Sequence, residues 1–183
     1  MKKKSLLFIS LLMTLLIFTG CGKEKAEDIL YKVLSNEKEF KLEDKEYKLE
    51  DYMKDSPKHL DTIAYTYVDM DKDGTKELVT YLSGADAEYI VFRYNDKTIY
   101  GYKYSMKDFQ DLRENGIYKS VVNEDAYAYL STKFENNNKV EISNATTDGK
   151  KYTVDNVESS KEAFESKENE ILSVNKAEFK KYK

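Results

Sequence analysis

The sequence predicts an α+β fold, in which a curved antiparallel β-meander sheet is flanked by N- and C-terminal helices. Two observations lead to this class. Through the middle of the chain, from Thr62 onwards, apolar residues recur with a period of two, which is typical of consecutive strands. Near both ends the spacing changes to that of amphipathic helices, over residues 26–35 and 160–169. Helices and strands are therefore segregated along the chain.

The elements follow one another in a simple order. After the first helix we expect a hairpin over 40–49 and a helical turn over 49–53. A short helix is predicted at 107–113, and residues 176–182 are expected to form another. Turn residues such as Asp148-Gly149 separate the strands. The strands of the meander are expected at 62–68, 78–82, 89–94, 98–104, 118–122, 126–134, 139–143 and 151–154.

The start of the chain has the layout of a secretory signal. Lysines at positions 2–4 precede an uncharged apolar run over 6–18, which is too short to span a bilayer comfortably. The chain's only cysteine, Cys21, comes next after two small residues. The segment resembles a bacterial lipoprotein signal, in which the cysteine is diacylated and the preceding peptide bond is cleaved. Such signals usually carry leucine where this chain has Phe18.

That resemblance implies a location. Residues 1–20 would be a signal peptide, Cys21 the lipidated residue, and residues 21–25 a short tether. The lipid would anchor the protein on the extracytoplasmic face of a bacterial cell membrane. An ordinary signal peptide followed by an incidental cysteine is the alternative. We expect residues 26–183 to form a single α+β domain, present as a monomer.

Charge and cysteine usage exclude some partners and chemistries. The net charge of −4 becomes −7 without residues 1–20, with 27 basic against 34 acidic residues. This acidic balance argues against a nucleic-acid partner. With Cys21 lipidated, no thiol is left for a disulfide or a nucleophile.

The strongest motif is the acidic segment 69–77, with the sequence DMDKDGTKE. Oxygen ligands at alternate positions, followed by a glycine that permits a sharp turn, suit a hard cation of calcium's size. We predict a structural calcium ion here, because magnesium tolerates irregular loops poorly. The alternative is a solvated acidic turn. The expected ligands are the carboxylates of Asp69, Asp71, Asp73 and Glu77 and the backbone carbonyl of Thr75.

The loop resembles known calcium sites. It is similar to the first part of an EF-hand, but Thr80 stands where an EF-hand has its bidentate acid. It is closer to the strand–loop–strand calcium site of integrin-type propeller blades, with Glu77 at the ninth position. The wider stretch 63–104, with its acidic hairpin and tyrosine-rich strands, resembles a group of uncharacterised small lipoproteins of low-GC Gram-positive bacteria. That resemblance implies the fold and the location, and it implies no activity.

Catalytic and cofactor-binding residues are not predicted. His59, the only imidazole, falls in an expected loop, and no phosphate-binding glycine loop is present. The 16 tyrosines suggest either a face that binds glycan or peptide, or half-buried sheet surface. The sequence therefore favours a non-enzymatic module that contacts an unknown protein or the cell wall. The alternative is a calcium-dependent hydrolase of cell-wall glycan or peptide, with carboxylates as acid and base.

Overall fold

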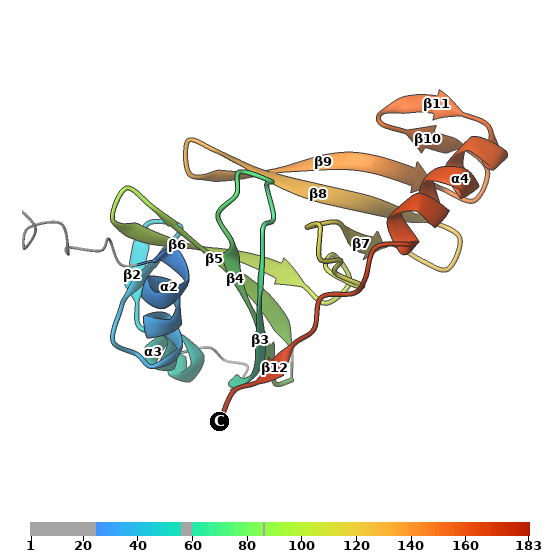
Figure 1. The fold of residues 1–183 in the computed structure, drawn as a ribbon. Helices are drawn as coiled ribbons and strands as arrows, with labels where there is room; N and C mark the ends of the chain where they lie inside the picture. The colour runs from blue at the N-terminus through green and yellow to red at the C-terminus, as the bar shows by residue number, and fades with distance from the viewer. Residues whose placement is uncertain (1–24, 56–59, 86) are drawn as a thin grey trace, which may run out of the picture.

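The computed structural model describes residues 25–55, 60–85 and 87–183, and these form three helices and two β-sheets (Figure 1). The fold is α+β, as the sequence predicts. Helices α2 (Ala26–Leu34) and α3 (Leu49–Asp55) belong to the N-terminal part, and α4 (Lys161–Leu172) follows most of the strands. The expected signal peptide, Cys21 and His59 lie outside the described residues.

The first sheet contains the first four strands of the predicted meander, whereas the later strands of the meander form a separate sheet. Strands β3 to β6 are consecutive antiparallel neighbours, and the sheet order is β12-β3-β4-β5-β6-β1-β2. A single parallel pairing, between Lys41 and Tyr100, attaches the β1–β2 hairpin to β6. The strands are β1 (Phe40–Leu42), β2 (Lys45–Tyr47), β3 (Asp61–Val68), β4 (Glu77–Ser83), β5 (Glu88–Asn95), β6 (Thr98–Ser105) and β12 (Lys180–Lys181).

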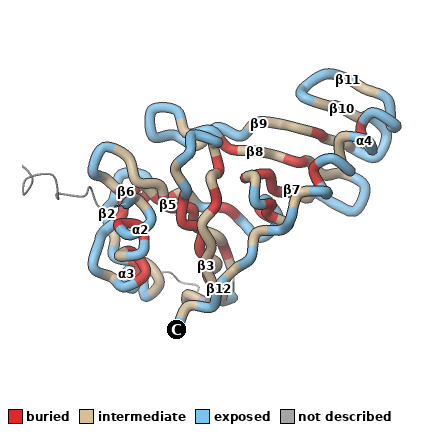
Figure 2. Tube along the Cα trace, in the orientation of Figure 1, coloured by how far each residue is buried: buried red, intermediate tan, exposed pale blue. Residues whose placement is uncertain are grey.

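The central strands of this sheet are buried on both faces, which explains their nearly continuous apolar sequences. One face, including Leu78 and Phe92, packs against α2. The opposite face, including Val79 and Val91, packs against Phe109 and Tyr118. Buried residues consequently concentrate in the middle of this sheet (Figure 2).

The later strands form a second sheet of order β11-β10-β9-β8-β7. Its longest hairpin, β8–β9, turns at Asn136 and Asn137, whose φ angles of 50° and 61° fit a two-residue turn. The buried hydroxyl of Thr132 lies 3.0 Å from the Tyr104 hydroxyl of the first sheet, so this hairpin joins the two sheets. The strands are β7 (Tyr118–Val121), β8 (Tyr127–Glu135), β9 (Asn138–Thr147), β10 (Tyr152–Val154) and β11 (Val157–Ser159).

The C-terminal helix packs on the far end of this second sheet. Its residues Phe164 and Ile171 form a core cluster with Ala145 of β9. The Ser160 hydroxyl accepts a 3.2 Å hydrogen bond from the Ala163 N–H, which confirms the serine cap that starts the helix.

Two predicted helices are wrong. Residues 107–113 are not helical, because the backbone of Gln110 pairs with that of Lys119 and Asp111 has a left-handed φ of 52°. Residues 176–182 are mainly extended. Lys176 bridges to Arg113, and β12 pairs with β3 at the edge of the first sheet. The sequence interpretation also missed β11.

Candidate metal centre

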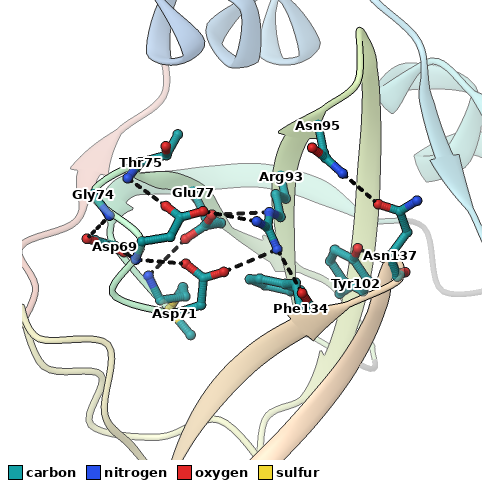
Figure 3. A network of polar contacts seen from close by, with 12 residues as sticks. Asp69, Asp71, Gly74, Thr75, Glu77, Arg93, Asn95, Tyr102, Phe134 and Asn137 are labelled. Carbon is teal, nitrogen blue, oxygen red and sulfur yellow. Dashed lines mark hydrogen bonds and ion pairs between the residues drawn. The ribbon is translucent and has the colours of Figure 1, made fainter.

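The acidic segment forms the loop between β3 and β4, whose pairing ends at Val68 and Glu77. The loop is held by hydrogen bonds from its own backbone to its carboxylates (Figure 3). The Asp69 carboxylate accepts hydrogen bonds from the N–H groups of Asp73, at 3.1 Å, and Gly74, at 3.0 Å. Left-handed φ angles at Lys72 (62°) and Gly74 (89°) allow the chain to fold back on itself.

Three of the predicted ligands converge. Asp69, Asp71 and Glu77 each offer a carboxylate oxygen, and these three atoms lie within 4.8 Å of one another. Asp73 is not part of this group. Its Oδ1 accepts a 2.7 Å hydrogen bond from the Thr75 N–H, and its Oδ2 faces Arg93. The Thr75 carbonyl as a ligand stays a prediction.

Glu77 is the most unusual acid of the loop, since only 1% of its surface is exposed. Its Oε2 accepts a 2.8 Å hydrogen bond from the Met70 N–H. Its Oε1 is buried and receives no hydrogen bond from any described residue, although Arg93 Nε lies 4.0 Å away. Burial, together with the negative charges of Asp71 and Asp73, raises the pKa of Glu77 to about 8.

Arg93 on β5 is a residue of the candidate site that the sequence interpretation missed. Its Nη1 lies 3.1 Å from Asp71 Oδ2, and its Nη2 donates a 3.0 Å hydrogen bond to Asp73 Oδ2. Burial nevertheless raises the pKa of Asp71, against the lowering effect of Arg93. The attraction of Arg93 therefore does not offset the effect of burial on Asp71. The strand register could have revealed Arg93. Phe92 pairs with Leu78, so Arg93, the next residue on β5, lies opposite Glu77, the residue before Leu78.

The back of the loop is fixed by the protein core. The side chain of Met70 is fully buried among aromatic residues of the first sheet's core. Gly116 has a φ of 79°, and a Cβ atom there would lie 2.8 Å from the Asp69 carbonyl oxygen. Only glycine fits this approach, so the loop backbone is packed against the 113–117 turn.

This arrangement fits a hard divalent cation. Calcium takes six to eight oxygen ligands, and water and backbone carbonyls commonly complete a set of carboxylates. The buried Oε1 of Glu77 lacks a hydrogen-bond donor among the described residues, and one carboxylate oxygen of Glu77 lies in the group shared with Asp69 and Asp71. Asp69, Asp71 and Glu77 would hold the ion.

A second feature is a cleft of about 840 Å³ between the sheets, lined by Asp111, Glu168 and several aromatic residues. Glu168 accepts hydrogen bonds from the hydroxyls of Tyr127 and Tyr129, at 2.9 and 3.0 Å. Burial acts to raise the pKa of Asp111, but hydrogen bonds and ion pairs with Lys176 and Arg113 lower it below its ordinary value. Asp111 therefore lacks the raised pKa that suits a general acid.

The tyrosines serve mainly as packing residues. Tyr104, Tyr118 and Tyr129 are buried, and others pack against the two core clusters of the first sheet. This distribution favours the interpretation as half-buried sheet surface over a dedicated binding face.

Comparison with protein-family models, with curated proteins and with solved structures finds no match to this chain. The resemblance to small Gram-positive lipoproteins therefore stays a prediction, as do the signal peptide and the lipidation of Cys21. In the part of the chain that the structure describes, no helix has the length and apolar character needed to cross a bilayer.

Proposed function

We propose that this protein is a bacterial lipoprotein, anchored through Cys21 on the extracytoplasmic face of the cell membrane, whose β3–β4 loop is braced by calcium. Its role is that of a non-enzymatic binding module that contacts a protein or the cell wall. The main observation in support of the metal site is the burial of the Glu77 carboxylate. A buried carboxylate oxygen without a donor among the described residues is costly unless a cation or a proton reaches it.

The electrostatics of the loop support a divalent ion. Two carboxylate oxygens 4.8 Å apart repel each other by roughly 3 kcal/mol at an effective dielectric constant of about 20. When all three are ionised, Asp69, Asp71 and Glu77 form three such pairs, and the charge of Asp71 is one cause of the raised pKa of Glu77. A cation of charge +2 at their centre replaces these repulsions with attractions.

The loop's position supports a structural role for the ion. Met70 and Gly116 already fix the backbone of the loop, and Glu77 begins a central strand of the first sheet. An ion at this junction would hold the ends of β3 and β4 together. Extracellular calcium modules work with dissociation constants of roughly 10⁻⁴–10⁻³ M, which a site with three carboxylates can reach.

Thermal unfolding of the full chain in detergent tests the proposal. We expect a higher melting temperature in millimolar calcium than in chelator, and calcium at ten times the dissociation constant adds about 1.4 kcal/mol. Asp71→Asn should remove most of this shift. Asp44→Asn, at an exposed acid in the β1–β2 turn, is the matched control and should keep it. Coincident curves for the wild-type protein with and without calcium would refute the site.

One observation favours a second candidate, a calcium-dependent hydrolase of cell-wall glycan or peptide. The cleft contains two carboxylates, Asp111 and Glu168. The lowered pKa of Asp111 counts against this role. Incubation of the protein with cell-wall fragments separates the two candidates. A binding module sediments with the fragments, whereas a hydrolase releases soluble products, and Glu168→Gln abolishes that release.

A further inference from the structure

The guanidinium of Arg93 contacts two different parts of the molecule (Figure 3). On one side it pairs with Asp71 and Asp73 of the metal loop. On the other side it reaches the β8–β9 hairpin of the second sheet. Its Nη1 donates a 3.4 Å hydrogen bond to the Phe134 carbonyl oxygen, and its central carbon lies 4.8 Å from the centre of the Phe134 ring. One side chain thus connects the loop to the hairpin.

The tip of this hairpin rests on the first sheet through exposed polar contacts. Asn95 donates a 3.0 Å hydrogen bond to the side chain of Asn137, and the Tyr102 hydroxyl donates one of 3.1 Å to the Asn137 carbonyl oxygen. The Tyr102 and Phe134 rings lie 4.7 Å apart. Exposed hydrogen bonds of this kind contribute little net stability, so a change in a charged contact beside them can shift the position of the hairpin.

Calcium and Arg93 need the same oxygens. Asp71 Oδ1 accepts a hydrogen bond from the Asp73 N–H, at 3.3 Å, so Oδ2 is the oxygen that the loop backbone leaves for a cation. Arg93 lies 3.1 Å from that Oδ2. The Oε1 of Glu77 also faces Arg93, at 4.0 Å. A divalent ion at the shared centre would stand next to a positive guanidinium, and the two charges repel.

We propose that calcium and Arg93 compete for the loop carboxylates, so that calcium binding withdraws the guanidinium from Asp71 and weakens its contact with Phe134. This inference rests on the proposed calcium site. The competition would make the contact between the β8–β9 hairpin and the first sheet dependent on calcium. Linkage is reciprocal, so a partner that presses the hairpin onto the first sheet lowers calcium affinity.

Titration calorimetry with calcium on the full chain tests the competition. Arg93→Met should bind calcium about tenfold tighter or more, because the competitor is removed. Lys76→Met removes the same charge from an exposed position in the same loop. It should change the affinity by less than about twofold, because exposed charges are screened. Equal affinity in the wild type and Arg93→Met would overturn the competition while leaving the calcium site intact. Absence of binding in both proteins would overturn the site and the competition together.

Arg93→Met leaves the loop acids without their cation, and it can fail to fold without calcium. Phe134→Leu avoids this, because it keeps Arg93 and removes only the ring on which the guanidinium rests. It should tighten calcium binding by about two- to fivefold, the effect of losing one cation–π contact. In the wild type, hydrogen exchange of the amides at 134–138 should become faster when calcium is added. Unchanged affinity in Phe134→Leu together with unchanged exchange would overturn the coupling.

Discussion

The Met70 N–H donates a 2.8 Å hydrogen bond to Glu77 Oε2 and so closes the β3–β4 loop across its two ends. Met70 stands at the start of the loop with its side chain fully buried, and Glu77 is the first residue of β4. Glu77 Oε1 is free of donors among the described residues, and Glu77 offers one carboxylate oxygen to the group that it shares with Asp69 and Asp71. The ligands are therefore placed before any ion arrives, which lowers the ordering cost of binding.

The variant Glu77→Gln separates the ligand role of this side chain from its structural role. Glutamine can still accept the hydrogen bond from Met70, but it carries no charge. We expect calcium-dependent stabilisation to be lost, while the metal-free protein at pH 9 gains roughly 1 kcal/mol because no charge is buried. Chemical denaturation with calcium and with chelator measures both effects. Glu158→Gln, at an exposed position in β11, is the control and should change neither.

The stability of the metal-free protein should fall as the pH rises. The pKa of Glu77 is about 8 in the folded protein and 4.5 in the reference state, so between these values the folded protein binds more protons than the unfolded one. The stabilisation of the folded protein by the proton on Glu77 is complete below pH 4.5. It is lost as the pH rises through 8, and the free energy of unfolding falls by no more than about 1.4 kcal/mol per pH unit. The raised pKa of Asp71 acts in the same direction.

Urea denaturation in chelator from pH 5.5 to 8.5 measures this slope. Glu77→Gln should flatten it, and saturating calcium should flatten it as well, since the ion replaces the proton. A metal-free protein whose stability rises over this range would contradict the assignment of a raised pKa to Glu77.

The variant Gly116→Ala tests the packing of the loop against the 113–117 turn. Alanine at a φ of 79° with its Cβ 2.8 Å from a backbone oxygen should cost about 2 kcal/mol or more. Gly74→Ala has a similar φ of 89° but meets no atom within 4 Å, so in chelator it should cost only about 1 kcal/mol. Equal losses in the two variants would show that the close approach to Asp69 is unimportant.

The variant Cys21→Ser tests the anchor. Without a thiol to acylate, the protein should leave the membrane fraction and lose its incorporation of labelled fatty acid. A protein that still fractionates with membranes after this change would contradict lipidation as the means of attachment.

The meander was predictable because its signals are local. Alternating apolar residues and turn residues between the strands identify β3 to β6 without knowledge of the rest of the chain. The division into two sheets was not predictable, since it depends on contacts between distant segments, such as that between Tyr104 and Thr132. The segment 107–113 shows the same limit. Phe109 and Leu112 have helical spacing, but they are buried residues of an irregular segment of turns, in which Gln110 pairs with Lys119.

The candidate site was predictable only in part for the same reason. The alternation of acids over 69–77 identified Asp69, Asp71 and Glu77, which the structure brings together. Arg93 lies on another strand, so no pattern within the loop reveals it, and only the pairing register of β4 and β5 places it beside Glu77. Its approach also explains why Asp73 turns away from the shared centre, because Asp73 Oδ2 is hydrogen-bonded to Arg93.

The central claim is tested most directly by a crystal structure of the protein grown in calcium, with anomalous data collected to locate the ion. We expect one calcium peak about 2.3–2.6 Å from oxygens of Asp69, Asp71 and Glu77. A loop without such a peak, with Arg93 still paired to Asp71 and Asp73 in millimolar calcium, would contradict it.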